Sequence, residues 1–378
     1  MRKRSVDAVV IGGGVIGSSI AFHMAKHGLK VVLLERERLA GQASGAAAGM
    51  LAAQAESDRP GPLFELLRHS RALFPALAEE LRELSGIDIG LVRRGLLKIA
   101  ATEEEDGELR RRLHFQRQAG ERGEHLTAGE VRRMEPGLSH ALYSAAYFPD
   151  DGQVAAPELS MAFAKSAAGL GAELREFAGE ASLRIERGCV TGVVTAEGTV
   201  ACERAVLAAG VWSGRLLESA GAGGLPLFPV KGECFSVTAD VPLVRTTLFA
   251  ERCYMVPKRG GRLVVGATAV PGSYDRKVTL QGISALMRQA EALLPGIAHA
   301  EWEKAWCGLR PQTADGLPVL GAHPGVGGLY IAAGHYRNGI LLSPLTGELA
   351  AGWALGKPEL AAAASFRPDR LLQRTVKS

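Results

Sequence analysis

The chain has 378 residues, of which 47% are hydrophobic and 22% charged, and its formal net charge is +4. This composition is typical of a globular protein, and the length favours two domains over a single core. The basic residues are spread along the chain, and the densest patches, at 110–112 and 132–133, lie among glutamates on predicted helices. This pattern favours a solvated helix face over a nucleic-acid-binding surface. Five widely spaced cysteines without a C-x-x-C pair argue against a disulfide scaffold or a zinc site and favour a reducing compartment.

The N-terminus begins with the basic residues of Met1–Arg4 and continues into an apolar stretch, as a secretory signal would. Asp7 and the glycines of Gly12–Gly17 interrupt this stretch at spacings that a signal does not need and a nucleotide-binding loop does. No other stretch reaches the roughly 18 apolar residues that cross a membrane. The sequence therefore predicts a cytoplasmic protein without an integral membrane segment.

The first predicted elements form a β-α-β unit. Val6–Ile11 is an apolar run typical of a buried parallel strand, Val15–His27 has apolar residues at helical spacing, and Lys30–Glu35 is a second apolar run. Between the first strand and the helix the sequence fits G-x-G-x-x-G, and Glu35 follows Gly17 by 18 residues. This context favours a dinucleotide-binding loop over an ordinary glycine-rich turn.

Each residue type in the loop has a physical reason. Gly12 permits the tight turn, Gly14 lets the backbone approach a pyrophosphate, and Gly17 lets the helix pack closely on the strand. The helix N-terminus offers N–H groups and the positive end of its dipole to phosphates. Glu35 can accept hydrogen bonds from ribose hydroxyls. The unit therefore predicts a bound dinucleotide.

The remaining predicted elements complete an α/β fold. Helices are predicted at 63–84, 102–135, 157–169, 280–294 and 340–355. Strands are predicted at 91–100, 183–185, 190–194, 206–209, 230–237, 254–257 and 262–267. We expect a Rossmann-like domain that binds the dinucleotide and a second α+β substrate domain with a largely antiparallel sheet. The ranges assigned to the first domain are 1–85, 140–220 and 305–370, and those assigned to the second are 86–139 and 221–304.

Three features favour FAD over NAD as the dinucleotide. No second G-x-G-x-x-G follows a later predicted strand, so a separate nicotinamide domain is not expected. The segment 205–212 is a buried strand that ends in small residues, including Gly210, and can lie against a dinucleotide. The segment Gly334–Ile340 opens the last helix, where backbone N–H groups can support the N1–C2=O edge of a flavin.

With these segments in view, the chain resembles the D-amino acid oxidase superfamily of flavoproteins, and within it the glycine oxidase family of the thiamine pathway. The resemblance covers nearly the full length. It is carried by the loop with Glu35 and by the segments 44–51, 207–213, 253–257, 264–268, 308–311, 315–318 and 334–339. It implies FAD-dependent oxidation of glycine and other small amines or amino acids, such as sarcosine and small D-amino acids, to an oxo acid, ammonia and hydrogen peroxide. Oxygen as electron acceptor, glycine imine for thiamine biosynthesis and a homo-oligomer, a tetramer by resemblance, are further implications.

The loop and the resemblance together predict the site. FAD contacts are expected from Gly12, Gly14, Val15, Ile16, Gly17, Glu35, Arg36, Ala43, Ser44, Ala48, Gly49, Met50, Gly210, His335, Tyr336, Arg337, Asn338, Gly339, Ile340 and Leu341. The resemblance assigns the substrate carboxylate to Arg310, aided by Tyr254, with Arg337 and Met50 in the same pocket. An arginine presents a planar fork that matches a carboxylate bidentately. The alternatives are a surface salt bridge for Arg310, a core tyrosine for Tyr254 and a structural or flavin-supporting role for Arg337.

Two departures from relatives and two functional alternatives stay open. Ala269 and Val270 stand where many relatives carry an acidic residue, which leaves the size and polarity of the pocket open. Cys307 lies near the region where some relatives attach the flavin covalently, but its offset favours non-covalent FAD and a buried structural cysteine.

No metal, catalytic triad or carboxylate pair is expected, because hydride transfer from Cα to the flavin N5 depends on positioning. One alternative is a D-amino acid or sarcosine dehydrogenase with a non-oxygen acceptor. The other is a flavin-containing subunit or a non-catalytic binding module of a larger complex.

Overall fold

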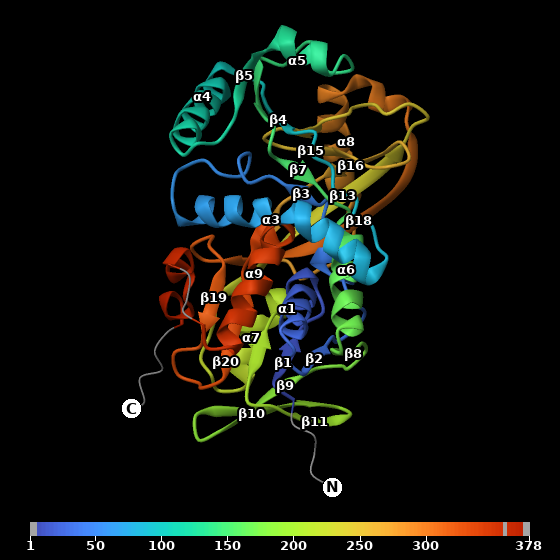
Figure 1. The fold of residues 1–378 in the computed structure, drawn as a ribbon. Coiled ribbons are helices and arrows are strands. Elements are labelled where there is room, and N and C mark those ends of the chain that lie inside the picture. Colours follow the sequence, from blue (N-terminus) through green and yellow to red (C-terminus); the bar gives the residue numbers. More distant parts are fainter. Residues whose placement is uncertain (1–5, 358–360, 373–378) are drawn as a thin grey trace.

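Two large β-sheets organise the protein. The computed structural model describes residues 6–357 and 361–372, so the basic segment Met1–Arg4 lies outside the described residues. Within them the strands form sheets of six and nine strands and two small sheets of three and two strands. In Figure 1 the labelled strands of the six-stranded sheet lie in the lower half, and most of the nine-stranded sheet lies in the upper half with α4, α5 and α8. The predicted α/β fold is confirmed.

The six-stranded sheet contains the predicted β-α-β unit. Its order is β19 (Val319–Ala322), β20 (Leu329–Ala333), β12 (Ala205–Leu207), β1 (Ala8–Ile11), β2 (Val31–Leu34) and β8 (Glu173–Arg175). Neighbouring strands are parallel except for β19 and β20. Helix α1 (Val15–Lys26) joins β1 to β2, as the sequence predicts. The carboxyl end of β1 therefore leads straight into the glycine loop and the N-terminus of α1.

Strand β1 is apolar throughout because both of its faces are covered. Ala8 and Val10 belong to a buried cluster with side chains of α1, α3 (Pro62–Ser85), α6 (Ala156–Gly169) and α9 (Gly339–Ala354). Val9 and Ile11 belong to a second cluster on the opposite face. That face is covered by β9 (Ser182–Glu186), β10 (Cys189–Thr195), β11 (Gly198–Ala201) and α7 (Ser213–Ser219). Burial on both sides fixes the strand that carries the loop.

Helix α9 is apolar nearly all round because it is a core helix. Its side chains pack in the same cluster as α1, α3 and α6. A helix that is hydrophobic on every face is found in a core or in a membrane. Among the described residues, however, no helix combines the length and apolarity that a bilayer crossing requires.

The nine-stranded sheet is mostly antiparallel, with only β14 and β4 paired in parallel. Its order is β17 (Val270–Pro271), β13 (Leu227–Thr238), β16 (Arg262–Gly266), β15 (Tyr254–Pro257), β14 (Thr247–Phe249), β4 (Leu96–Ala100), β6 (Ser144–Phe148) and β5 (Glu124–Thr127), with β18 (Glu301–Thr313) also paired to β13. Side chains of α5 (Ala128–Met134) and α8 (Leu280–Leu293) pack in one cluster on this sheet, and those of α4 (Glu103–Gln118) pack in another.

The predicted continuous helix over 102–135 is wrong. Helix α4 ends at Gln118, β5 follows, and a capping box between Thr127 and Glu130 starts α5. Glycines break the helical pattern here, since Gly120 has a φ of 81°. The strands missing from the prediction include β5, β6, β8, β14, β18, β19 and β20. The domain ranges stay a prediction, although β6 and residues 305–313 of β18, which they assign to the FAD-binding domain, pair with strands of the nine-stranded sheet.

A buried histidine between α1 and α9 predicts an acid-dependent loss of stability. Burial lowers the pKa of His23 to about 4, and its Nδ1 lies 2.9 Å from the carbonyl oxygen of Ser19. The pKa of His23 in the folded protein lies below its unfolded value of about 6.5, so the unfolded chain takes up the proton first. The contribution of neutral His23 to stability is therefore complete above pH 6.5 and is lost as the pH falls toward 4. We expect acidification to lower the free energy of unfolding of the parent protein by up to about 3 kcal/mol more than that of His23→Gln. Denaturant titrations of both proteins at pH 7 and pH 4.5 measure this difference. Equal losses of unfolding free energy in the two proteins would contradict the role of His23.

Candidate functional site

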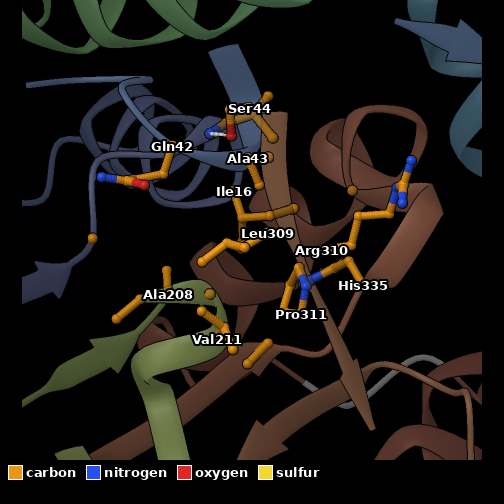
Figure 2. Close-up of a pocket in the computed structure, with 18 of the residues that line it drawn as sticks. Ile16, Gln42, Ala43, Ser44, Ala208, Val211, Leu309, Arg310, Pro311 and His335 are labelled. Carbon is orange, nitrogen blue, oxygen red and sulfur yellow. Dashed lines mark hydrogen bonds between the residues drawn. The ribbon is translucent and has the colours of Figure 1, made fainter. Parts of the chain in front are cut away.

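A single elongated cavity joins the glycine loop to the large sheet. Its volume is about 790 Å³, within the range of cofactor and ligand sites. In Figure 2, Ser44 and Ala43 lie with Ile16 above the cavity, Leu309, Arg310 and Pro311 come from β18, and Ala208 and Val211 lie below. All the predicted site residues line this cavity except Gly17 and Leu341. The structure therefore brings together segments that are more than 300 positions apart in the sequence.

Gly17 has a packing role instead of a lining role. A Cβ atom at Gly17 would lie 1.8 Å from the carbonyl oxygen of Gly12, so the first turn of α1 can approach the loop only without a side chain there. Gly12 has a φ of 109°, and a Cβ atom would lie 2.5 Å from the carbonyl oxygen of Ala208. Leu341 is buried in the cluster that α9 forms with α1, α3 and α6. Gly17 and Leu341 therefore lie behind the wall of the cavity, whereas Gly12 lines it.

The N-terminus of α1 opens into the cavity beside Ser44. The Ser44 hydroxyl accepts a hydrogen bond from the N–H of Val15 at 2.9 Å (Figure 2). Gly14 has no side chain to cover this end, and a Cβ atom there would meet only the Ser44 hydroxyl, at 3.0 Å. A helix N-terminus left open in this way suits the charge and shape of a pyrophosphate.

Glu35 is fixed by backbone donors at the end of β2. One carboxylate oxygen accepts a hydrogen bond from the N–H of Gly13 at 2.7 Å, and the other accepts one from the N–H of Glu37 at 2.9 Å. An ionised carboxylate has about four acceptor positions, so two bonds leave capacity for ribose hydroxyls. Glu35 lines the cavity, as the sequence predicts.

An arginine and a tryptophan stack at the same end of the cavity. The Arg36 guanidinium lies 4.6 Å from the ring centroid of Trp212, and both side chains line the cavity. Arg215, in the first turn of α7, also lines the cavity. The sequence prediction includes Arg36 but omits Trp212 and Arg215. Trp212 lies in one of the segments that carry the family resemblance, and this was the available signal.

Arg310 lies over a glycine of the neighbouring strand. In the β13–β18 pair, Gly232 stands opposite Gly308, and a Cβ atom at Gly232 would lie 2.4 Å from both terminal nitrogens of Arg310. The guanidinium donates a hydrogen bond to the carbonyl oxygen of Thr268 at 3.2 Å. Arg310 makes no ion pair with any described residue. These contacts do not support a surface salt bridge, and they leave the charge of Arg310 without a carboxylate partner in this part of the chain.

Tyr254 is a second polar group at this end. Tyr254, Gly266 and Cys234 stand side by side on β15, β16 and β13, and the Tyr254 hydroxyl lies 3.5 Å from the Cys234 sulfur across Gly266. Burial raises the pKa of Tyr254 well above its usual value, so the hydroxyl keeps its proton and can donate it in a hydrogen bond. Both Tyr254 and Cys234 line the cavity.

Arg337 has a carboxylate partner that the sequence prediction omits. Its Nε donates a hydrogen bond to a Glu56 oxygen at 3.0 Å, and its guanidinium lies 5.3 Å from the ring centroid of Phe249. The charge of Glu56 raises the pKa of Arg337. Arg337 and Glu56 both line the cavity, which supports a structural role for this arginine beside any contact with a ligand.

His335 and Cys307 are both held by protein groups. Burial lowers the pKa of His335 to about 3, and its Nε2 lies 3.2 Å from the Thr346 hydroxyl, so the ring is neutral at physiological pH. The Cys307 thiol donates to the carbonyl oxygen of Arg276 at 2.8 Å, and Cys307 is not among the lining residues. All five cysteines of the chain lie within the described residues and are free thiols. The arrangement supports FAD binding without a bond to Cys307.

These residues fit an FAD molecule. The open helix N-terminus suits the pyrophosphate, Glu35 suits the ribose, and the cavity continues past Ala46–Ala48 to the segment 335–340, where the sequence predicts support for the flavin ring. Arg310 and Tyr254 line the same cavity, and their contact with a substrate stays a prediction.

Comparison with known proteins agrees with this geometry. The family model DAO, described as FAD dependent oxidoreductase, matches residues 7–353. A glycine oxidase of Geobacillus kaustophilus is 51% identical over 349 residues, covering 91% of this chain and 92% of that protein. A bifunctional protein ThiO/ThiG of Synechocystis is 35% identical over 377 residues, covering 98% of this chain and 54% of that protein.

Solved structures place the fold in the same group. The crystal structure of a glycine oxidase from Geobacillus kaustophilus has a TM-score of 0.92 at 49% identity, covering 98% of this chain and 99% of that one. The family model extends over both large sheets and the cavity between them. The chain therefore belongs to the DAO family of FAD-dependent oxidoreductases, and within it to the glycine oxidase group of amino acid oxidases.

Proposed function

We propose that the chain oxidises glycine and other small amines or amino acids, such as sarcosine and small D-amino acids, to an oxo acid, ammonia and hydrogen peroxide. The observation that carries this proposal is the pairing of an uncompensated arginine with a protonated tyrosine in the FAD cavity. Arg310 and Tyr254 are linked through β13, where Gly232 lies under one and Cys234 beside the other. The glycine oxidases among the relatives support the same substrate class.

The two groups would hold the substrate by its carboxylate. The planar fork of Arg310 can donate two parallel hydrogen bonds to the two carboxylate oxygens. The Tyr254 hydroxyl can donate one more, because its raised pKa keeps the proton in place. This anchor leaves the amine and the Cα atom of a small amino acid free to face the rest of the cavity.

Positioning would supply most of the catalysis. When bound, FAD supplies the acceptor for the hydride that leaves Cα. The substrate amine must be neutral at that moment, because its lone pair drives the departure of the hydride. His335 would not serve as the base, because its pKa of about 3 and its buried ring make it a poor proton acceptor. Fixing the carboxylate orders the Cα–H bond, and such fixed geometry replaces a bimolecular encounter.

The wider biological role is part of the same proposal. The match to the ThiO/ThiG protein supports glycine imine as a product delivered to thiamine biosynthesis. We also propose non-covalent FAD, a cytoplasmic location and a homo-oligomeric assembly, as expected from the sequence.

The positions Ala269 and Val270 adjoin Thr268, whose carbonyl oxygen accepts the Arg310 hydrogen bond, so they lie close to the proposed carboxylate site.

A panel of amino acids tests the proposal. Purified holoenzyme is mixed without air with glycine, sarcosine, D-alanine, D-proline, L-alanine and methylamine, and bleaching of the flavin absorbance is recorded. Rapid bleaching by glycine and sarcosine is expected. Peroxide formed in air without an added acceptor then separates an oxidase from a dehydrogenase. A flavin that none of these compounds reduces would exclude the proposed function.

A methyl group at Gly232 should disturb the substrate anchor without touching the dinucleotide loop. In Gly232→Ala the new Cβ atom would occupy the position that the Arg310 guanidinium now fills. Misplacement of a binding group by about 1 Å can cost roughly 100-fold in rate, so we expect kcat/KM for glycine to fall by roughly 10- to 100-fold with normal FAD content. Gly169→Ala is the control, because a Cβ atom there meets no atom within 4 Å. Equal activity of the two variants would contradict the role of Gly232.

A further inference from the structure

The described groups at the substrate end of the cavity carry more positive than negative charge. Two arginines line this end, and only one of them has a carboxylate partner. Arg337 pairs with Glu56, and the distance between the Arg337 Nη2 and the Glu56 carboxylate is 3.0 Å. Arg310 forms no ion pair with any residue that the structure describes, and its hydrogen bond goes to a carbonyl oxygen. One guanidinium therefore remains for a ligand, which matches a substrate with a single carboxylate.

Glu56 is held in place by a buried network beneath it. The carboxylate of Asp151 accepts hydrogen bonds from the N–H groups of Gln54 and Ala55, at 3.1 and 3.0 Å. The guanidinium of Arg112 donates to the carbonyl oxygens of Ala55, at 3.0 Å, and Ser57. Asp151 is fully buried. Because the backbone on both sides of Glu56 is fixed, its carboxylate faces Arg337 with little freedom to move away.

Two further cations lie near this pair. The Lys98 ammonium is 4.2 Å from the ring centroid of Phe249, and Arg337 lies against the same ring. Burial lowers the pKa of Lys98 to about 7, so it is only partly charged near neutral pH. Arg112 is opposed by the carboxylates of Asp58, Glu56, Glu108 and Asp151. Glu56 is therefore the carboxylate of the described cavity lining that offsets the cations at this end.

We infer that Glu56 is a specificity-determining residue, whose carboxylate neutralises Arg337 and so restricts the site to substrates with one carboxylate. The inference rests on the proposed function. A second anionic group on the substrate would face Glu56 and meet an arginine whose charge is already compensated. Like charges across a binding site disfavour the wrong ligand, and this is a common device of specificity.

Removal of the Glu56 charge should change the preference of the site. In Glu56→Gln the amide keeps the size of the side chain but leaves Arg337 without a counter-charge. Iminodiacetate is a glycine whose nitrogen carries a second carboxymethyl group, and it is the substrate probe. We expect the ratio of kcat/KM for iminodiacetate to that for glycine to rise by about tenfold or more, because interfacial charge pairs carry couplings of this size or larger.

Equilibrium binding gives a readout that needs no turnover. Acetate and malonate carry one and two carboxylates and have no amine to oxidise. Their dissociation constants are measured from the perturbation of the flavin absorbance of the oxidised holoenzyme. We expect Glu56→Gln to bind malonate about tenfold more tightly relative to acetate than the parent protein does. The malonate measurement decides the question even where iminodiacetate is too large to be oxidised.

Two further variants separate local charge from general effects. Glu303→Gln removes a carboxylate from Arg262, outside the cavity, and should leave both ratios unchanged. In Arg337→Met/Glu56→Gln the gain should disappear, because its source is the uncompensated Arg337. Thermal melting and FAD content of each variant show that the fold and the cofactor are retained.

The outcomes are distinct. If Glu56→Gln leaves the malonate-to-acetate ratio unchanged, or if the gain persists without Arg337, the inference is overturned. If Glu56→Gln instead weakens every ligand alike, Glu56 acts only as a structural partner of Arg337, and the inference is also overturned. The proposed function fails separately, when glycine does not bleach the parent flavin without air, and the binding ratios still test the charge balance in that case.

Discussion

Arg310→Ala is expected to lose on the order of 100-fold or more in kcat/KM for glycine while it keeps its fold and its FAD. Arg310 pairs with no carboxylate among the residues that the structure describes, so its removal leaves no such carboxylate without a partner. The loss falls on the substrate instead, because truncating one member of a charge-assisted pair costs roughly 2–5 kcal/mol in comparable sites. Stopped-flow reduction of the flavin by glycine, together with the ratio of protein to flavin absorbance, measures both parts of the expectation.

An amine without a carboxylate provides the decisive comparison. Methylamine never uses the anchor, so it should be a poor substrate of the parent enzyme and should lose little further in Arg310→Ala. Arg310→Lys should recover only part of the glycine activity, because a point charge cannot copy the guanidinium fork. Equal losses for glycine and methylamine would mean that Arg310 is not the anchor. Arg337 would then be the next residue to test.

The parts of the site that could be predicted from the sequence are those with a local physical signature. The glycine loop is predictable because its strand, turn and helix lie within one short segment, and each glycine answers to a backbone requirement of that segment. Strand β1 is predictable because burial on both faces makes it apolar throughout. Arg310 and Tyr254 were predicted from the resemblance to a family, since neither stands in a local motif that defines its role.

The missing parts depend on pairings between distant segments. Strand β18 has an alternation of polar and partly buried residues that does not form an apolar run, and only its pairing with β13 shows that Gly232 lies under Arg310. Glu56 lies in a loop without a periodic pattern, and its partner Arg337 is 281 positions away. Arg36 and Trp212 are 176 positions apart, and only the fold shows that their side chains stack in the cavity wall. A single sequence carries no signal for such long-range contacts.

Gly14→Val should give a folded protein that does not retain FAD. Gly14 has φ −72° and ψ −179°, an extended conformation that valine adopts readily, so the substitution imposes no backbone strain. The nearest atom to a Cβ at Gly14 is the Ser44 hydroxyl, at 3.0 Å, which belongs to a movable side chain. The branched side chain would project from the N-terminus of α1 into the space where the pyrophosphate approaches the backbone. Absorbance of the purified protein near the flavin maximum measures the retained FAD.

Two comparisons show whether Gly14→Val acts on the cofactor or on the fold. Because FAD stabilises only the folded state that binds it, Gly14→Val should melt at the temperature of the parent apoprotein, and added FAD should not raise that temperature. Gly17→Ala should behave in the opposite way, because its Cβ atom would strike the carbonyl oxygen of Gly12 at 1.8 Å and does not enter the cavity. Gly17→Ala should therefore melt below the parent apoprotein even when FAD is absent from both. Normal FAD content in a folded Gly14→Val protein would mean that the dinucleotide lies elsewhere.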